Sequence, residues 1–170
     1  MVFAPSVPMS VYLVAVVVGE LEHVSASSGG AFPVQMGVWA RPGMSTQLQY
    51  ALDVGVAVLN KYNAWFGIPF PLPKCDMVAI PDFAAGAMEN WGLITYRESA
   101  LLASAATSSQ SELLRVSLVV AHELAHQCVP RERGERVAMG PCALVQVEWE
   151  PRHDRVVEHA VVERGVRVVC

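Results

Sequence analysis

Residues 109–127 read SQSELLRVSLVVAHELAHQ, and they predict the most informative helix of the chain. Ser109 followed three residues later by Glu112 forms a capping box, a pattern that starts helices. We expect the helix to run through His126. Apolar residues that can bury its back lie along the middle of the stretch: Val116, Leu118, Val119 and Val120.

The end of this helix carries the sequence H-E-x-x-H at residues 122–126. A spacing of four places His122 and His126 one turn apart on the same helix face, where two imidazoles can bind one metal ion. Glu123 lies next to the first histidine and can take a proton from a water that the metal acidifies. Chance occurrence is the alternative interpretation. The amphipathic helix around the motif favours a metal site over chance.

A second candidate site lies upstream, in the loop Gly86-Ala87-Met88-Glu89-Asn90. Glycine and alanine allow a ligand to approach the backbone closely. A carboxylate such as Glu89 at the end of a cleft can bind a free α-ammonium group through charge-assisted hydrogen bonds, which selects substrates with a free N-terminus. Taken alone the loop is ambiguous, because a solvated turn glutamate would look the same.

The residues on both sides of this loop predict further elements. Strands are expected at residues 11–18, 34–39, 77–80 and 93–96, because these runs are apolar and rich in β-branched or aromatic residues. A Ser/Gly loop is expected at residues 25–30, and a rigid proline-rich connector at residues 69–73. Together with the helices, these strands indicate an α+β fold.

A second long helix is predicted to begin near Thr46, which forms a capping box with Gln49. Gly67 and Pro69 are expected to end it. Between these limits one apolar stripe follows the helical period: Leu48, Leu52, Gly55, Leu59, Tyr62 and Phe66.

Composition excludes several classes of protein. Apolar residues make up 53% of the 170 residues and charged residues 16%, which argues against global disorder. The net charge of −4 gives no basic surface for nucleic acid. No apolar run reaches the ~20 residues that span a bilayer. The four cysteines form no C-x-x-C pair, which favours a reducing compartment.

The composition and the periodicity of the sequence change after Gln127. All seven basic residues from Cys128 onward are Arg and eleven residues are Val, and no periodicity persists for long. We expect residues 128–170 to be an unrelated tail, aberrant or poorly packed on the rest. A diverged C-terminal segment with its own strands and helices is the alternative.

Together the motifs resemble the alanyl and puromycin-sensitive aminopeptidases, which are zinc exopeptidases with a thermolysin-like catalytic domain. Residues 81–98, PDFAAGAMENWGLITYRE, resemble the exopeptidase signature of that family almost residue for residue. Residues 122–127, HELAHQ, resemble its zinc helix at the same distance from the signature. Residues 8–15 and 69–74 also match the family pattern, so the similarity covers roughly residues 8–127.

The resemblance implies a role for each matched residue. His122 and His126 would bind one Zn²⁺ and Glu123 would be the general base. Glu89 would bind the α-amine of a peptide substrate, and the backbone of residues 86–90 would align the peptide. Residues 1–45 would be the end of an N-terminal β-domain and residues 46–127 the first part of the catalytic domain. The implied partners are peptides with a free N-terminus, and the expected compartment is the cytoplasm.

The sequence also departs from the family pattern. In the family a tryptophan follows the zinc helix, and a glutamate nineteen residues after the second histidine completes the metal site. Here Cys128 follows Gln127, and Val145 stands at the position of the third ligand. The family's transition-state tyrosine lies further downstream, in sequence that this chain does not resemble.

The expected function is therefore that of a zinc metalloaminopeptidase by family, in a chain that is itself truncated and inactive. A non-catalytic fragment that binds peptides or partners is the alternative. A third possibility, a metal-binding module without hydrolysis, would need a substitute third ligand further along the chain: Glu148, Glu150, His153 or His159.

Overall fold

The computed structural model describes residues 8–30, 33–127, 146–148 and 167–169. Its centre is a five-stranded mixed sheet in the order β1-β2-β3-β5-β4. The strands are β1 (Glu22–Ser27), β2 (Gln35–Ala40), β3 (Lys74–Ile80), β4 (Ala87–Met88) and β5 (Leu93–Arg97). β2, β3 and β5 run parallel, and β1 and β4 pair antiparallel at the two edges. The predicted α+β class is confirmed.

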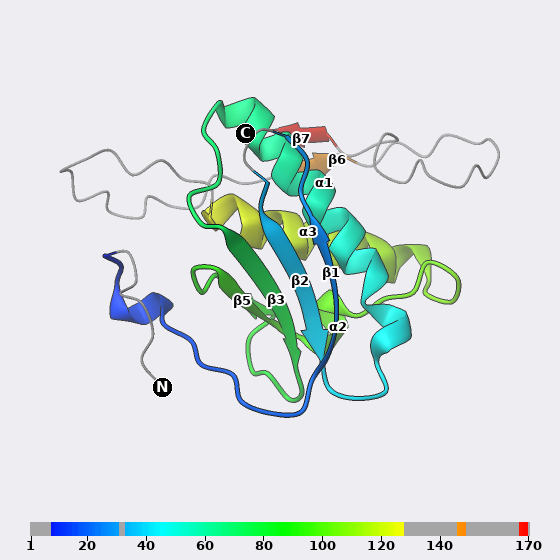
Figure 1. The fold of residues 1–170 in the computed structure, drawn as a ribbon. Helices are drawn as coiled ribbons and strands as arrows, with labels where there is room; N and C mark the ends of the chain where they lie inside the picture. The colour runs from blue at the N-terminus through cyan, green and yellow to red at the C-terminus, as the bar shows by residue number, and fades with distance from the viewer. Residues whose placement is uncertain (1–7, 31–32, 128–145, 149–166, 170) are drawn as a thin grey trace.

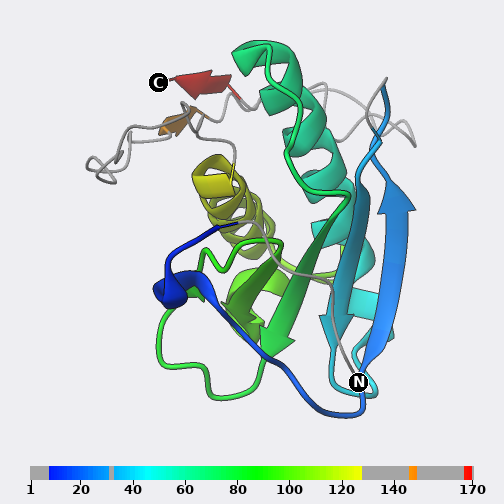
Figure 2. The ribbon, with the colours of Figure 1, turned by 60° about the vertical axis from the view of Figure 1, so that its left-hand side comes forward.

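Both long helices, α1 (Gln49–Phe66) and α3 (Gln110–Gln127), lie on the same face of this sheet (Figures 1 and 2). α1 connects the parallel strands β2 and β3, since a parallel pair needs a long crossover. A short helix α2 (Glu98–Leu101) follows β5 and leads to α3. The enclosed core holds Met36 and Val38 of β2, Cys75 and Met77 of β3, and the inner faces of the helices.

The apolar stripe predicted for α1 forms its buried face. Leu48, Leu52, Leu59 and Tyr62 are buried, while Phe66 at the end is partly exposed. The Tyr62 hydroxyl donates to the carbonyl of Ala121 at 3.0 Å, which ties α1 to α3.

The two ends of α1 differ in how well the sequence predicted them. Gly67 ends the helix with a left-handed φ of 64°, as predicted. The capping box at Thr46 is wrong. A 3-10 turn, η2 (Ser45–Gln47), precedes α1, which begins at Gln49 without a side-chain cap. The Gln49 side chain donates instead to Asp53 Oδ1 at 2.8 Å.

The start of α3 is the predicted capping box. The backbone N–H of Ser109 donates to Glu112 Oε2 at 2.7 Å, and the N–H of Glu112 donates to Ser109 Oγ at 3.3 Å. The Ser109 hydroxyl also donates to Glu112 Oε2, at 2.8 Å, and the two hydrogen bonds that this carboxylate accepts from Ser109 lower the pKa of Glu112.

Substituting Ser109→Ala is therefore expected to lower the free energy of unfolding by about 1 kcal/mol, because the cap of α3 loses its acceptor. Urea denaturation followed by circular dichroism measures this change. Ser111→Ala, two residues further on, is the control. The Ser111 hydroxyl is exposed and contacts Ser109 Oγ at 3.0 Å but accepts from no backbone N–H in the hydrogen bonds described, so its loss should change the stability less. Equal stability of the wild type and Ser109→Ala would contradict the cap.

The strand predicted at residues 11–18 is wrong. Residues 11–18 do not form a buried strand: a 3-10 turn, η1 (Val11–Leu13), opens the segment, and Val16 and Val18 are 81% and 92% exposed. Ser10 accounts for the turn, because its hydroxyl accepts from the N–H of Tyr12. Among the described residues no strand pairs with this segment, so its β-branched composition alone does not make it a strand.

The expected loop at residues 25–30 is also partly wrong, since Ser25–Ser27 belong to β1. This edge strand alternates half-buried and exposed residues and contains small polar side chains, which resemble a loop in the sequence. The strands predicted at 34–39, 77–80 and 93–96 are confirmed as β2, β3 and β5, with β3 starting three residues earlier.

The tail prediction falls mostly outside the described residues. Two short strands are described there, β6 (Gln146–Glu148) and β7 (Arg167–Val169), and they pair antiparallel with each other. In the part of the chain that the structure describes, no helix is long and apolar enough to cross a membrane.

Candidate metal and peptide site

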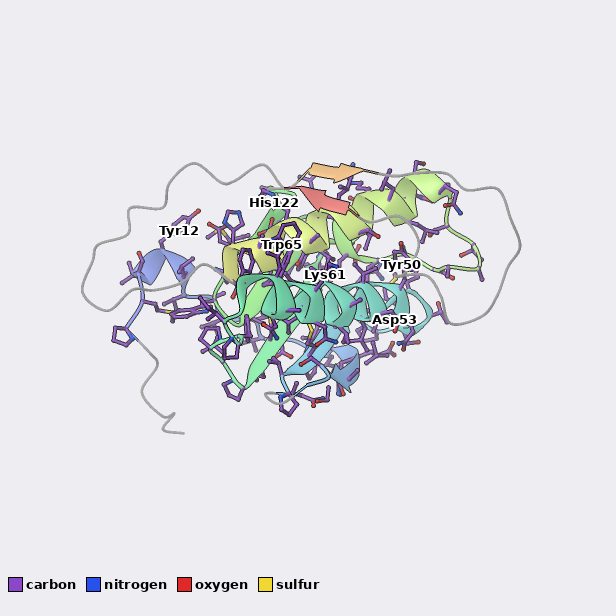
Figure 3. The ribbon with its side chains drawn as sticks, turned by 90° about the horizontal axis from the view of Figure 1, so that it is seen from above. Tyr12, Tyr50, Asp53, Lys61, Trp65 and His122 are labelled. Atoms are coloured by element: carbon purple, nitrogen blue, oxygen red, sulfur yellow. The ribbon has the colours of Figure 1, made fainter. Side chains whose placement is uncertain are left out.

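The two histidines of the motif face each other across one turn of α3. Their Nε2 atoms are 3.2 Å apart, and their rings meet edge to face. Two nitrogens bound to the same tetrahedral zinc at the usual bond length lie about 3.3 Å apart. The helix therefore holds both imidazoles at the separation that a shared ion needs. Figure 3 shows His122 on α3, at the end of the helix away from its cap.

Burial keeps His122 in the state that binds metals. It lowers the pKa of His122, the charge of His126 lowers it further, and the nearby Glu89 opposes both effects. A neutral imidazole has a free lone pair, so metal binding at neutral pH does not first require loss of a proton from this residue.

Glu123 points into the protein beside these histidines and is only 6% exposed. Its Oε2 is buried, with no hydrogen-bond partner among the residues the structure describes. Burial raises the pKa of Glu123 to about 7, and the negative charge of Glu89 adds to the rise. A buried carboxyl that titrates near neutrality suits a general base.

The loop that carries Glu89 leaves the edge of the sheet. Gly86 accepts from the backbone of Arg97, and Ala87 and Met88 form β4, which pairs with β5. Asn90 is buried, and its side-chain oxygen accepts from Thr95 Oγ1 at 2.9 Å. The sequence predicted a loop over residues 86–90, but two of these residues, Ala87 and Met88, form the short strand β4.

Gly92 closes the loop with a φ of +80°, a conformation that favours glycine. Its carbonyl accepts from the backbone of Asp76 on β3 at 3.0 Å. A Cβ at this position would lie 2.8 Å from Leu72 Cδ1. The loop is thus fixed to β3 of the sheet at its Gly92 end.

The two motifs lie close together in space. One ligand atom each of Glu89, Glu123 and His126 lies within 4.8 Å of the others. Residues 33 positions apart in the chain, His122 and Glu89, are close enough for the charge of Glu89 to influence the pKa of His122. Two imidazoles and two carboxylates form a donor set that fits Zn²⁺.

The expected third-ligand position, Val145, lies outside the described residues, as do the substitutes Glu150, His153 and His159. For Glu148 the structure describes only the backbone, in β6. The metal prediction therefore rests on the histidine pair and the carboxylates around it.

Two buried polar residues of the site were missed from the sequence. Tyr96 of β5 is fully buried near Glu123, and burial together with that negative charge raises the pKa of Tyr96 well above its usual range. Gln127 follows His126 and is one turn from Glu123, on the side of α3 that faces the loop. Its position one turn after Glu123 was the available signal for Gln127. Tyr96 lies in the motif of residues 81–98, but no pattern there indicates that its side chain is buried beside Glu123.

A helix with H-E-x-x-H beside a loop carboxylate on a mixed sheet is the arrangement of a metallopeptidase. The model of the Peptidase family M1 domain matches residues 50–139, more than half of the chain, and the chain belongs to this family. M1 peptidases are zinc-dependent. The match includes the first twelve residues after Gln127. It therefore extends past Gln127, where the change in composition predicted the end of the similarity.

The relatives with similar sequences are aminopeptidases. The chain is 56% identical over 124 residues to a puromycin-sensitive aminopeptidase of Caenorhabditis elegans, which covers 73% of this chain. It is 52% identical over 125 residues, 74% of the chain, to human endoplasmic reticulum aminopeptidase 1. It is 54% identical over 119 residues, 70% of the chain, to aminopeptidase M1-C of rice. The matched region spans 13% of the length of each of these relatives.

Glu123→Gln is expected to stabilise the protein in the presence of a metal chelator, by roughly 1–3 kcal/mol above pH 7, because the neutral amide removes the cost of a buried unpaired carboxylate. The folded pKa of about 7 lies above the ordinary 4.5. The wild type therefore loses stability as the pH rises from about 4.5 to about 7, and the difference between the variants should vanish below that window.

Urea denaturation of wild type and Glu123→Gln at several pH values measures this difference. Glu20→Gln, at an exposed position, is the control and should show no such trend. If the difference in free energy of unfolding between the two proteins did not change with pH, burial would not disfavour the charged form of Glu123, and the assignment would be contradicted.

Proposed function

We propose that this site is the zinc and substrate-amine site of an aminopeptidase, which removes N-terminal residues from peptides. The observation that carries the proposal is the convergence of Glu89 with His126 and Glu123 within 4.8 Å. One side of the site offers imidazole nitrogens to a metal, and the other offers a carboxylate to a cationic group. An N-terminal residue presents both of the matching groups, an α-ammonium and a carbonyl bonded to the same Cα.

In this proposal His122 and His126 hold the ion and Glu89 binds the α-ammonium of the peptide. The backbone of Gly86, Ala87, Met88 and Asn90 aligns the peptide beside the ion. Zinc, when bound, acts as a Lewis acid and lowers the pKa of a water toward neutrality. Glu123 accepts the proton of the attacking water and later returns it to the leaving amine. The buried setting of Glu123 excludes solvent from this proton transfer.

The fold assignment within the family is also a proposal. We assign residues 46–127 to the first part of a thermolysin-like catalytic domain and residues 1–45 to the end of a β-domain. β1 and β2 lie within residues 1–45. β1 pairs with β2, and β2 pairs with β3 of the other segment, so the two strands extend the sheet that carries the site. The compartment stays a prediction, because the similar relatives include proteins named for the endoplasmic reticulum.

A second candidate function is zinc and peptide binding without hydrolysis. It is favoured by Val145 at the position where the family places its third ligand. Catalytic zinc sites normally combine three protein ligands with one water, and valine supplies no donor. For the polypeptide as given we therefore propose weak zinc binding and no turnover above background.

The experiment is to measure zinc stoichiometry and the hydrolysis of an aminoacyl fluorogenic substrate by the purified chain, with Glu123→Gln as the control. We expect bound zinc and equal, background rates for both proteins. Zinc-dependent turnover that Glu123→Gln abolishes would show that a further residue completes the metal site. Absence of bound zinc at any concentration would contradict both candidate functions.

A further inference from the structure

Gln127 joins the two halves of the site. The residue is 5% exposed and ends α3, directly after His126. Its Nε2 donates to the backbone carbonyl of Glu89 at 2.9 Å and lies 3.5 Å from the carbonyl of Asn90. Its Oε1 accepts from the backbone N–H of Gly92 at 3.1 Å. One amide side chain therefore contacts three backbone groups of the loop that carries Glu89.

The other hydrogen bonds described for this loop lead elsewhere. Asn90 binds Thr95 of β5 through its side chain, and its side-chain amide reaches the carbonyl of Leu13. The Gly92 carbonyl accepts from β3. These bonds fix the loop to the sheet and to the N-terminal segment. Of the hydrogen bonds described for this loop, those to Gln127 are the ones that reach α3, the helix that carries the histidines.

We propose that Gln127 is a positioning residue that sets the distance between Glu89 and the histidine pair. This inference rests on the proposed function, in which Glu89 binds the substrate amine. Gln127 lies one turn after Glu123, so the same face of α3 presents Glu123 to the Glu89 side chain and Gln127 to the Glu89 backbone. The amide holds the loop by its main chain, and the Glu89 carboxylate stays available for a ligand.

The chemistry of the contact requires an amide. Gln127 must accept a hydrogen bond from Gly92 and donate to two carbonyls, and only an uncharged side chain with both functions meets these needs. Methionine has a similar length and offers neither function. Glutamate keeps the acceptor for Gly92 but presents a carboxylate to the carbonyls of Glu89 and Asn90.

The test uses Gln127→Met and Gln127→Glu, with Gln110→Met as the matched control, since Gln110 is the exposed first residue of the same helix. Two affinities are measured on the zinc-loaded chain: for a short peptide with a free N-terminus and for the same peptide N-acetylated. Zinc affinity and hydrogen exchange of the Gly92 amide are measured alongside. Glu89→Gln serves as the reference for direct loss of the amine contact.

We expect Gln127→Met to reduce the preference for the free N-terminus about tenfold, as loss of a buried hydrogen bond would, while zinc affinity changes less than threefold. The Gly92 amide should exchange faster in Gln127→Met and stay protected in Gln127→Glu, although both variants lose the preference. Gln110→Met should match the wild type throughout.

The outcomes separate this inference from the proposed function. A preference that Glu89→Gln abolishes and Gln127→Met retains would overturn the positioning role and leave the proposed function intact. Absence of any preference in the wild type would overturn the proposed function, and the positioning role with it. Unchanged Gly92 exchange in Gln127→Met would overturn the contact itself, whatever the peptide affinities. Equal losses of zinc affinity and peptide preference would show a merely structural role.

Discussion

Substituting His126→Ala is expected to weaken zinc binding by at least ~100-fold. Removing residues that only orient a metal ligand already costs 10–100-fold in affinity, so removing one of the two histidines themselves should cost more. The pair is preformed, with the two Nε2 atoms 3.2 Å apart, and the remaining imidazole of His122 cannot chelate an ion alone. Titration of the chain with zinc against a chromophoric chelator measures the change.

His23→Ala is the matched control for this substitution. His23 stacks on Trp39 of β2, with ring centroids 4.1 Å apart, and belongs to the exposed face of the edge strand β1. Its loss should leave zinc affinity unchanged. If His126→Ala and His23→Ala bind zinc equally well, the ion binds elsewhere in the chain and the assignment of α3 as the metal helix fails.

The second large effect is expected in the core beneath the site. Leu124 lies between the two histidines in sequence, and its side chain is fully buried. Leu124→Ala should lower the free energy of unfolding by 2–5 kcal/mol (order of magnitude), because the lost methylene groups leave a cavity that the surrounding elements cannot fill. Urea denaturation followed by circular dichroism measures this loss.

Leu118→Ala, a half-buried leucine on the same helix, is the control and should lose clearly less stability. The comparison tests the packing of α3 against the sheet, on which the position of both histidines depends. If both variants lost the same free energy of unfolding, the observation that Leu124 lies on the buried face of α3 and Leu118 does not would be contradicted.

The elements predicted well from the sequence are those whose local signals and tertiary environment agree. α3 has a capping box, an apolar back and a buried face that coincide, and α1 ends at a glycine in the left-handed conformation. β2, β3 and β5 form the central parallel strands, buried on the helix-covered face, so their apolar runs reflect their burial.

The elements predicted poorly depend on contacts that the sequence does not encode locally. Residues 11–18 have the composition of a strand, yet pairing decides whether a segment becomes one. β1 is a strand because it pairs with β2, in spite of its serines and alanine. Thr46 and Gln49 form a capping-box pattern three residues apart, but the chain turns there through η2 and the pattern is not used.

The candidate site shows the same division. The spacing of His122, Glu123 and His126 follows from helical geometry alone, so the sequence predicted their shared face. That Glu89 lies beside them was expected from the family resemblance and agrees with the structure. The contact of Gln127 with the loop backbone and the burial of Tyr96 next to Glu123 depend on the angle between α3 and the sheet, which no sequence pattern states.

The most direct test of the zinc site is the X-ray absorption spectrum of the zinc-loaded chain at the zinc edge. We expect two imidazole ligands with Zn–N distances of about 2.0–2.1 Å, and oxygen donors in the remaining positions. His126→Ala should remove the outer-shell scattering of one imidazole. A spectrum without imidazole scattering, or one dominated by sulfur at about 2.3 Å, would show that zinc binds to other residues and would contradict the assignment of His122 and His126 as zinc ligands.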